Sequence, residues 1–335
     1  MTRSVSIRIA LVLCLTLASS GCGDNTAAQR IRIGMLPKLV GIGYFDAAEK
    51  GAREAAAELD IELIYDGPAD ARHEDQLRII EGWNALGVDV VAVAPNDPEG
   101  IAQTLRSVSD SGVRVISWDT DANADISRRS FFVNQAEDSA IAQGMVDLMV
   151  AARRQKGLPI AGPYLIVSGT PTASNQNSWI RLMTEYIADR YPEMELLPHL
   201  TPGEDQREAQ EQTATALNAH AELNGIWGIT SVALPAAARA VMDADRTDSV
   251  CVTGVSLPSL MREYVENGSV QSFLLWDVVD LGYLTVQVAA RLHSGGIQPG
   301  TSDFGRLKNI EVRDGMVILG PPMVFDSDNL DQYDF

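Results

Sequence analysis

Hydrogen-bonding side chains follow the apolar runs of this sequence. Lys38 follows the run 31–36, Asp119 ends the run 113–119, and Asn175 and Gln176 come shortly after another run. A carboxylate accepts hydrogen bonds from hydroxyl groups, an ammonium group donates them, and side-chain amides do both. Bonds to a charged partner are stronger than bonds between neutral groups. This combination suits the binding of a small polyhydroxylated molecule.

Most candidate contact residues lie at or just beyond the ends of apolar runs, and two aromatic candidates lie on the first turn of an expected helix. We expect their polar members to exchange hydrogen bonds with ligand hydroxyl groups, and their aromatic rings to cover the apolar edges of a ring-shaped ligand. The set is Lys38, Tyr44, Phe45, Trp118, Asp119, Asn175, Gln176, Thr230, Ser231 and Asp277.

Most of these candidates also have a purely structural explanation, which the sequence leaves open. Lys38 is either a ligand contact or the partner of Asp119 in an ion pair. Asn175 is a ligand contact, the N-cap of the following helix, or both. The remaining structural explanations are core packing for Tyr44, Phe45 and Trp118, a helix start for Thr230 and Ser231, and a hinge hydrogen bond for Asp277.

Sequence motifs for catalysis and cofactor binding are missing. The chain has no GxxxxGK[ST] phosphate loop, no GxSxG nucleophile elbow and no HExxH metal motif. Its four histidines are scattered without carboxylates at ligand spacing, and it has no CxxC pair. We therefore expect a binding protein with no enzymatic activity, no cofactor and no metal.

Two series of elements must position the candidate residues. Apolar runs that predict buried strands alternate with segments of helical spacing, which favours parallel sheets covered by helices. The expected strands are 31–36, 61–66, 88–95, 113–119, 163–169, 225–230, 250–256, 270–277 and 311–320. The expected helices are 45–59, 74–86, 100–111, 138–155, 176–191, 205–221, 234–244, 257–267 and 278–293. The pattern predicts an α/β fold with two Rossmann-like lobes, in which ligands bind beyond the carboxyl ends of strands.

The composition is that of a globular protein with an acidic balance. The 335 residues are 46% hydrophobic and 21% charged, with a formal net charge of −19. This length suffices for two domains. Binding to nucleic acid phosphates requires clustered Lys and Arg, so we expect no nucleic acid partner.

The N-terminus has the pattern of a secretory signal. Arg3 and Arg8 precede the apolar run 9–17, and small residues then lead to Cys22. The run is shorter than the roughly 20 residues that span a bilayer. We expect residues 1–21 to be removed as a signal peptide and Cys22 to be lipidated. Plain cleavage is the alternative, because Ser19 stands where a bacterial lipobox usually has Leu.

Several longer motifs carry a family resemblance. They include PKLVGIGYF (37–45), ISWDTDA (116–122), NQNSW (175–179), GVSLPSLMREYVENGSV (254–270) and LLWDVVDLGYLT (274–285). These resemble type I periplasmic sugar-binding proteins of ABC importers, and within that group the rhamnose-binding proteins and the related autoinducer-2 receptors. The likeness extends over nearly the whole chain after the signal.

The resemblance implies a two-lobed receptor whose parallel sheets are joined by a three-crossover hinge. The N-terminal lobe would comprise residues 30–130 and 277–305, and the C-terminal lobe residues 131–276 and 306–335. The protein would be a monomer of the periplasm, or a cell-envelope lipoprotein attached to the membrane only through its anchor. It would close on one sugar and deliver it to an ABC transporter permease.

The resemblance also bears on the ligand. It places Lys38, Asp119, Asn175, Gln176, Ile229 and Ser231 at positions that hold ligand polar groups in the autoinducer-2 branch. That branch has Asp, Pro and Ala where this chain has Asn175, Ile229 and Ser231. An unpaired polar group in a closed cleft costs about 1–3 kcal/mol, so we expect rhamnose or a similar deoxyhexose or pentose. The alternatives are an autoinducer-2 receptor, or a sugar receptor that feeds a sensor kinase or chemoreceptor.

Overall fold

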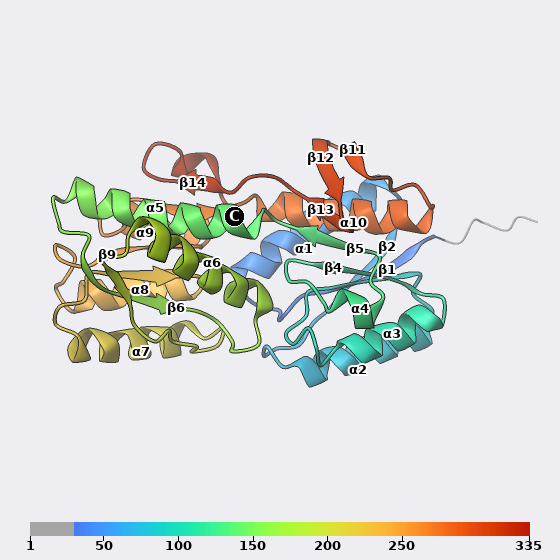
Figure 1. Cartoon of the computed structure of the whole chain (residues 1–335). Coiled ribbons are helices and arrows are strands. Elements are labelled where there is room, and N and C mark those ends of the chain that lie inside the picture. Colours follow the sequence, from blue (N-terminus) through green and yellow to red (C-terminus); the bar gives the residue numbers. More distant parts are fainter. Residues whose placement is uncertain (1–29) are drawn as a thin grey trace, which may run out of the picture. The chain divides into compact units, whose positions relative to one another are not determined.

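The computed structural model in Figure 1 describes residues 30–335 of the chain. The predicted signal peptide, residues 1–21, and the predicted lipidation at Cys22 lie outside the described residues. In the described part, strands and helices alternate along the chain and most neighbouring strands are parallel. This α/β architecture confirms the predicted fold class.

The first sheet has eight strands in the order β11-β12-β13-β5-β4-β3-β1-β2. Strands β1 to β5 are parallel neighbours, β13 runs parallel to β5, and β11, β12 and β13 form an antiparallel edge. Their bounds are β1 (Arg32–Leu36), β2 (Glu62–Tyr65), β3 (Val90–Val93), β4 (Arg114–Trp118), β5 (Phe131–Asn134), β11 (Gly300–Phe304), β12 (Leu307–Arg313) and β13 (Met316–Ile318).

Helices cover both faces of the first sheet (Figure 1). Helices α1 (Gly43–Glu58) and α10 (Val278–His293) pack on one face, and α2 (His73–Leu86), α3 (Ala102–Asp110) and the short α4 (Ala124–Ser127) lie on the other. Strand residues that are buried on both faces explain the continuous apolar runs of the sequence. Helices α1 and α10 can approach closely because Gly51 and Gly282 have no side chains. A Cβ at either position would lie within 2 Å of a backbone oxygen of the other helix.

The second sheet has four parallel strands in the order β7-β6-β8-β9. Its strands are β6 (Gly162–Val167), β7 (Met194–Leu196), β8 (Gly225–Gly228) and β9 (Cys251–Gly254). The surrounding helices are α5 (Asp138–Gln155), α6 (Ser174–Arg190), α7 (Gln206–Ala219), α8 (Ala233–Asp243) and α9 (Pro258–Glu266). A separate antiparallel pair joins β10 (Phe273–Leu275) to β14 (Met323–Phe325), and the 3-10 turn η1 (Leu330–Gln332) follows.

The chain passes between the two groups of elements three times. The crossings are the segments 134–138 from β5 to α5, 275–278 from β10 to α10, and 318–323 from β13 to β14. Two of these crossings begin at the carboxyl ends of β5 and β13 in the first sheet. The carboxyl ends of parallel strands are where open α/β sheets bind ligands.

The C-terminal region contains a hairpin that the sequence pattern did not predict. Residues 311–320 form no single strand, because β12 and β13 are joined by a turn at Asp314 and Gly315, whose φ values are 50° and 71°. An Asp-Gly pair with positive φ at both residues is typical of a tight hairpin.

The predicted lobe boundaries are wrong at two places. Residues 131–134 and 306–318 were expected in the second lobe, but β5, β12 and β13 pair within the first sheet. The physical reason is that β13 adds to β5 through parallel hydrogen bonds, and β12 then pairs with β13. The other lobe boundaries stay predictions.

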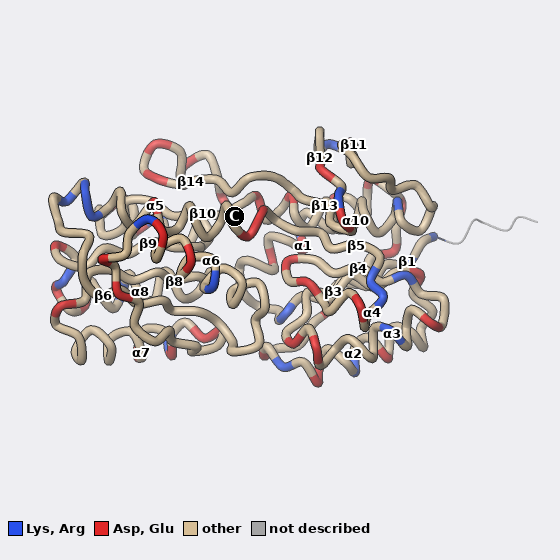
Figure 2. The backbone as a smooth tube through the Cα atoms, in the orientation of Figure 1, with Lys and Arg blue, Asp and Glu red and all other residues tan. Residues whose placement is uncertain are grey.

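Charged residues of both signs are spread along the described backbone (Figure 2). Several ion pairs join exposed side chains one helical turn apart, such as Arg181 with Glu185 and Arg239 with Asp243. Exposed pairs of this kind contribute little to stability. Within residues 30–335, no helix is long and apolar enough to cross a membrane.

Candidate ligand-binding site

A cavity opens where loops from the carboxyl ends of both sheets meet. It contains about 400 Å³ of space not filled by atoms, counting its opening to solvent. Its wall is formed by Lys38, Ile42, Tyr44, Phe45, Asp119, Asn175, Gln176, Trp179, Glu204, Ile229, Thr230, Ser231, Val255 and Trp276.

A buried polar network holds the loop that carries Lys38. Gln76 of α2 donates to the carbonyl oxygens of Pro37, at 3.0 Å, and of Ala94, at 2.8 Å. Its own side-chain oxygen accepts from the backbone N–H of Asn96 at 2.9 Å, and Asn96 Nδ2 donates to the Lys38 carbonyl at 2.7 Å. The backbone after β1 is thereby tied to the loop after β3.

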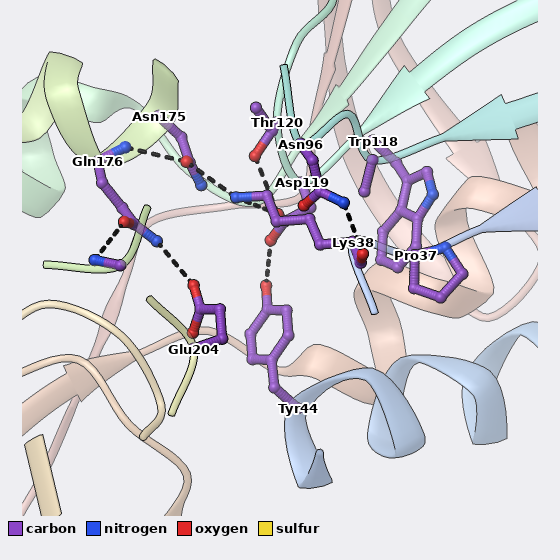
Figure 3. Close-up of polar contacts among 12 residues, drawn as sticks. Pro37, Lys38, Tyr44, Asn96, Trp118, Asp119, Thr120, Asn175, Gln176 and Glu204 are labelled. Carbon is purple, nitrogen blue, oxygen red and sulfur yellow. Dashed lines mark hydrogen bonds and ion pairs between the residues drawn. The ribbon is translucent and has the colours of Figure 1, made fainter. Parts of the chain in front are cut away.

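The Lys38 ammonium group reaches across the cavity (Figure 3). Nζ donates to Asn175 Oδ1 at 3.2 Å and lies 3.6 Å from Asp119 Oδ2, although the residue is only 5% exposed. Asn175 follows a strand of the second sheet, whereas Lys38 and Asp119 follow strands of the first. The ion pair considered from the sequence is present, and the same cation lines the cavity. An ammonium group has three donors, so one remains for a ligand.

Asp119 is held by three neighbouring side chains. Its φ of 60° is in the left-handed region, which Asp tolerates better than most residues. Oδ1 accepts from the Tyr44 hydroxyl at 2.7 Å, and Oδ2 accepts from Thr120 Oγ1 at 3.1 Å. Trp276 Nε1 in turn donates to the Tyr44 oxygen at 3.0 Å. Burial, followed by the nearby Asp119 charge, raises the pKa of Tyr44 well above its ordinary value, so the hydroxyl remains a donor.

On the second-sheet side, the Gln176 side chain has a fixed orientation. Its Oε1 accepts from Ser168 Oγ at 3.0 Å and from the Gly169 N–H at 2.8 Å. Its Nε2 is directed toward Glu204 Oε1, at 3.5 Å (Figure 3). The neighbouring Asn175 is not the N-cap, because α6 begins at Ser174 and Ala173 is its N-cap.

Aromatic rings complete the cavity wall. Tyr44 packs edge-on against Phe45 with ring centroids 5.1 Å apart, and against Trp276 at 6.2 Å. Trp179 packs against Trp276 as well, at 6.0 Å. Edge-to-face clusters of this kind are rigid apolar surfaces. The site therefore combines charged and amide groups with apolar walls.

All but two of the predicted contact residues line the cavity. Trp118 lies behind Phe45, with ring centroids 5.8 Å apart, and its Nε1 donates to the Leu36 carbonyl. Asp277 caps α10 by accepting from the Asp280 N–H at 2.9 Å. The structure thus places Trp118 in the core and Asp277 at a helix start, and brings neither to the cavity wall. Ligand contact by the others stays a prediction.

The residues predicted from the sequence do not include Glu204, Trp179 and Trp276, nor the apolar residues Ile42 and Val255. Glu204 follows β7, a strand of only three residues that the apolar pattern did not indicate. Trp179 lies three residues after Gln176 on α6, so helical spacing alone predicts that they share a face. Among residues 30–335, no group of three or more His, Cys, Asp or Glu side chains could hold a metal ion.

A direct hydrogen bond joins the loops on the two sides of the cavity. Thr172 Oγ1, after β6, donates to the Asn96 carbonyl, after β3, at 2.8 Å. A hydrogen bond contributes about 1 kcal/mol net, so Thr172→Val should weaken ligand affinity about fivefold by destabilising the closed arrangement. Titration calorimetry measures the change. Thr170→Val, in the same loop, is the matched control, and equal affinities of the two variants would contradict the assignment.

Comparison with known proteins places the chain in a family. The profile of the periplasmic binding protein domain matches residues 33–297. This is more than half of the chain, and the chain therefore belongs to that family.

Three individual proteins illustrate the likeness. The curated D-ribose/D-allose-binding protein of Pseudomonas aeruginosa is 24% identical over 316 residues, which cover 88% of this chain and 93% of that protein. LsrB from Clostridium saccharobutylicum, solved in complex with AI-2, is 25% identical with a TM-score of 0.86, over 91% of this chain and 100% of that one. An ABC transporter solute-binding protein from Clostridium phytofermentas, solved with bound L-rhamnose, is 28% identical with a TM-score of 0.82, over 91% and 98%.

Proposed function

We propose that this chain is an exported receptor that binds one small sugar and delivers it to an ABC transporter permease. The observation that carries the proposal is the composition of the cavity wall. Lys38 and Asp119 come from the first sheet, and Asn175 and Gln176 come from the second. A ligand that forms hydrogen bonds with residues of both sheets stabilises the closed arrangement. Closure then distinguishes the ligand-bound receptor from the free one.

The preferred ligand is rhamnose or a similar deoxyhexose or pentose. The relative from Clostridium phytofermentas was solved with L-rhamnose, and the Pseudomonas relative is named for ribose and allose. In this chain, amide, carboxylate and ammonium groups meet aromatic rings that would cover the apolar edge of such a sugar. Binding and release suffice for this role, so we propose no catalytic step.

Autoinducer-2 is the second candidate ligand. The structural likeness to LsrB in complex with AI-2 favours it, and so does the cavity position of Lys38, Asp119 and Gln176. Asn175 disfavours autoinducer-2 as the ligand, because the autoinducer-2 branch has Asp at this position. A neutral amide there removes one acceptor for a ligand hydroxyl group.

A thermal-shift screen tests the proposal. Rhamnose, ribose, xylose, galactose and autoinducer-2 are each added to the purified protein, with mannitol as a flexible polyol control. A ligand at 100 times its Kd adds about 2.7 kcal/mol to the free energy of unfolding. We expect rhamnose or a pentose to raise the melting temperature. A shift with autoinducer-2 alone would establish the second candidate, and turnover of any of these compounds would contradict a purely binding role.

A further inference from the structure

Glu204 faces the cavity from the second sheet and is only partly buried. It lies in the loop between β7 and α7, and Gln176 Nε2 donates to its Oε1 at the long distance of 3.5 Å. The loop approaches Gly169 so closely that a Cβ there would lie 2.5 Å from Glu204 Oε1 and 2.7 Å from Gln176 Oε1. The absence of a side chain at Gly169 is what lets the carboxylate take this position.

Asp119 and Glu204, the two carboxylates of the site, differ in how many hydrogen bonds they accept from neighbouring side chains. Asp119 accepts from Tyr44 and Thr120 and lies beside Lys38, so both of its oxygens have partners. A carboxylate has about four acceptor positions. Glu204 therefore keeps more of its acceptor capacity for a molecule in the cavity than Asp119 does.

The charged and polar groups around Glu204 do not fully offset the cost of burying its negative charge. Burial raises the pKa of Glu204, and the Asp119 charge raises it further. Lys38 and the Gln176 amide lower this pKa, as does the Thr230 hydroxyl, but burial is the largest of these influences. Hydrogen bonds donated to the carboxylate favour its charged form, so donors from a ligand would relieve this cost.

We propose that Glu204 is a specificity-determining residue, which accepts hydrogen bonds from ligand hydroxyl groups on the second-sheet side of the cavity. The inference rests on the proposed function and deepens it. With Asp119 on the first-sheet side, the site then selects ligands that carry hydroxyl donors at two separate edges. A sugar that lacks the hydroxyl facing Glu204 binds more weakly.

The pH dependence of binding has a definite sign. Ligand hydroxyls stabilise charged Glu204, so its pKa is lower in the complex than in the free protein. Affinity is therefore highest above the pKa of the free protein and falls as the pH is lowered through it. Binding in that range releases protons, by the reciprocity of linked equilibria.

The test compares Glu204→Gln with the wild type, using a sugar identified by the thermal-shift screen. Calorimetric titrations are run from pH 8 down to pH 5, in two buffers of different ionisation enthalpy. We expect Glu204→Gln to bind the sugar at least tenfold more weakly than the wild type at pH 8. Its affinity should also lack the fall at acidic pH that protonation of Glu204 causes in the wild type. Glu195→Gln, an exposed position on β7, is the matched control and should behave as the wild type.

The outcomes separate this inference from the proposed function. If the wild type binds no sugar of the screen, the proposed function fails and Glu204 loses its role with it. If the wild type binds and Glu204→Gln matches its affinity and pH profile, only the role of Glu204 is overturned. If Glu204→Gln does not fold, the two-buffer titrations of the wild type test the proposal. Sugar binding at acidic pH without any release of protons would overturn it.

Discussion

Asp119→Asn is expected to abolish the ligand-induced rise in melting temperature while leaving the protein folded. Asparagine keeps the size of the side chain and tolerates the left-handed backbone at this position. It removes the charge that faces Lys38 at 3.6 Å and that accepts from Tyr44 at 2.7 Å. Hydrogen bonds to a charged group contribute about 1.5–3 kcal/mol each, so affinity should fall about 100-fold or more.

The control for this substitution is Asp125→Asn. Asp125 is an exposed residue of α4 and carries the same charge change without touching the cavity. Titration calorimetry and melting curves are measured for both variants. Wild-type affinity in Asp119→Asn would remove this carboxylate from the binding site, and a variant unfolded at 25 °C would show that its role is structural.

Gln76→Leu is expected to lower the free energy of unfolding by several kcal/mol. The Gln76 side chain is fully buried and makes three hydrogen bonds, to Pro37, Ala94 and Asn96. Leucine is of similar size but leaves these three backbone groups without partners. Each buried unpaired group costs about 1–3 kcal/mol, so three such groups should lower the free energy of unfolding, measured by urea unfolding, by about 3 kcal/mol or more.

The same substitution also tests how Lys38 is positioned. Because Gln76 ties the loop after β1 to Asn96, its loss should weaken ligand binding even under conditions where the variant is folded. Gln103→Leu, an exposed position on α3, is the control and should change stability by less than about 0.5 kcal/mol. A Gln76→Leu protein as stable as this control would refute the proposed role of the network.

Long apolar runs made most of the fold predictable from the sequence. Strands buried on both faces, such as β1, β3 and β4, read as continuous apolar segments, and the helices between them have clear periodicity. The short strands β7 and β14, of three residues each, carry too little pattern to be recognised. The pairing of β12 and β13 with the first sheet depends on tertiary contacts that no local pattern contains.

The candidate site was predictable where its residues directly follow recognisable strands. Lys38 and Asp119 follow β1 and β4, and Thr230 and Ser231 follow β8. Glu204 was missed because the strand before it was missed. For Trp118 the sequence left core packing and ligand contact open, because a residue at a strand end can point into the core as readily as into the cavity. The packing against Phe45 shows that its ring lies in the core.

The most direct test of the central claim is a crystal structure of the protein with the sugar that gives the largest thermal shift. We expect density for one sugar molecule in the cavity, with hydroxyl groups within hydrogen-bond distance of Lys38, Asp119 and Gln176. Density for the sugar at another place on the chain, with this cavity filled only by water, would contradict the claim.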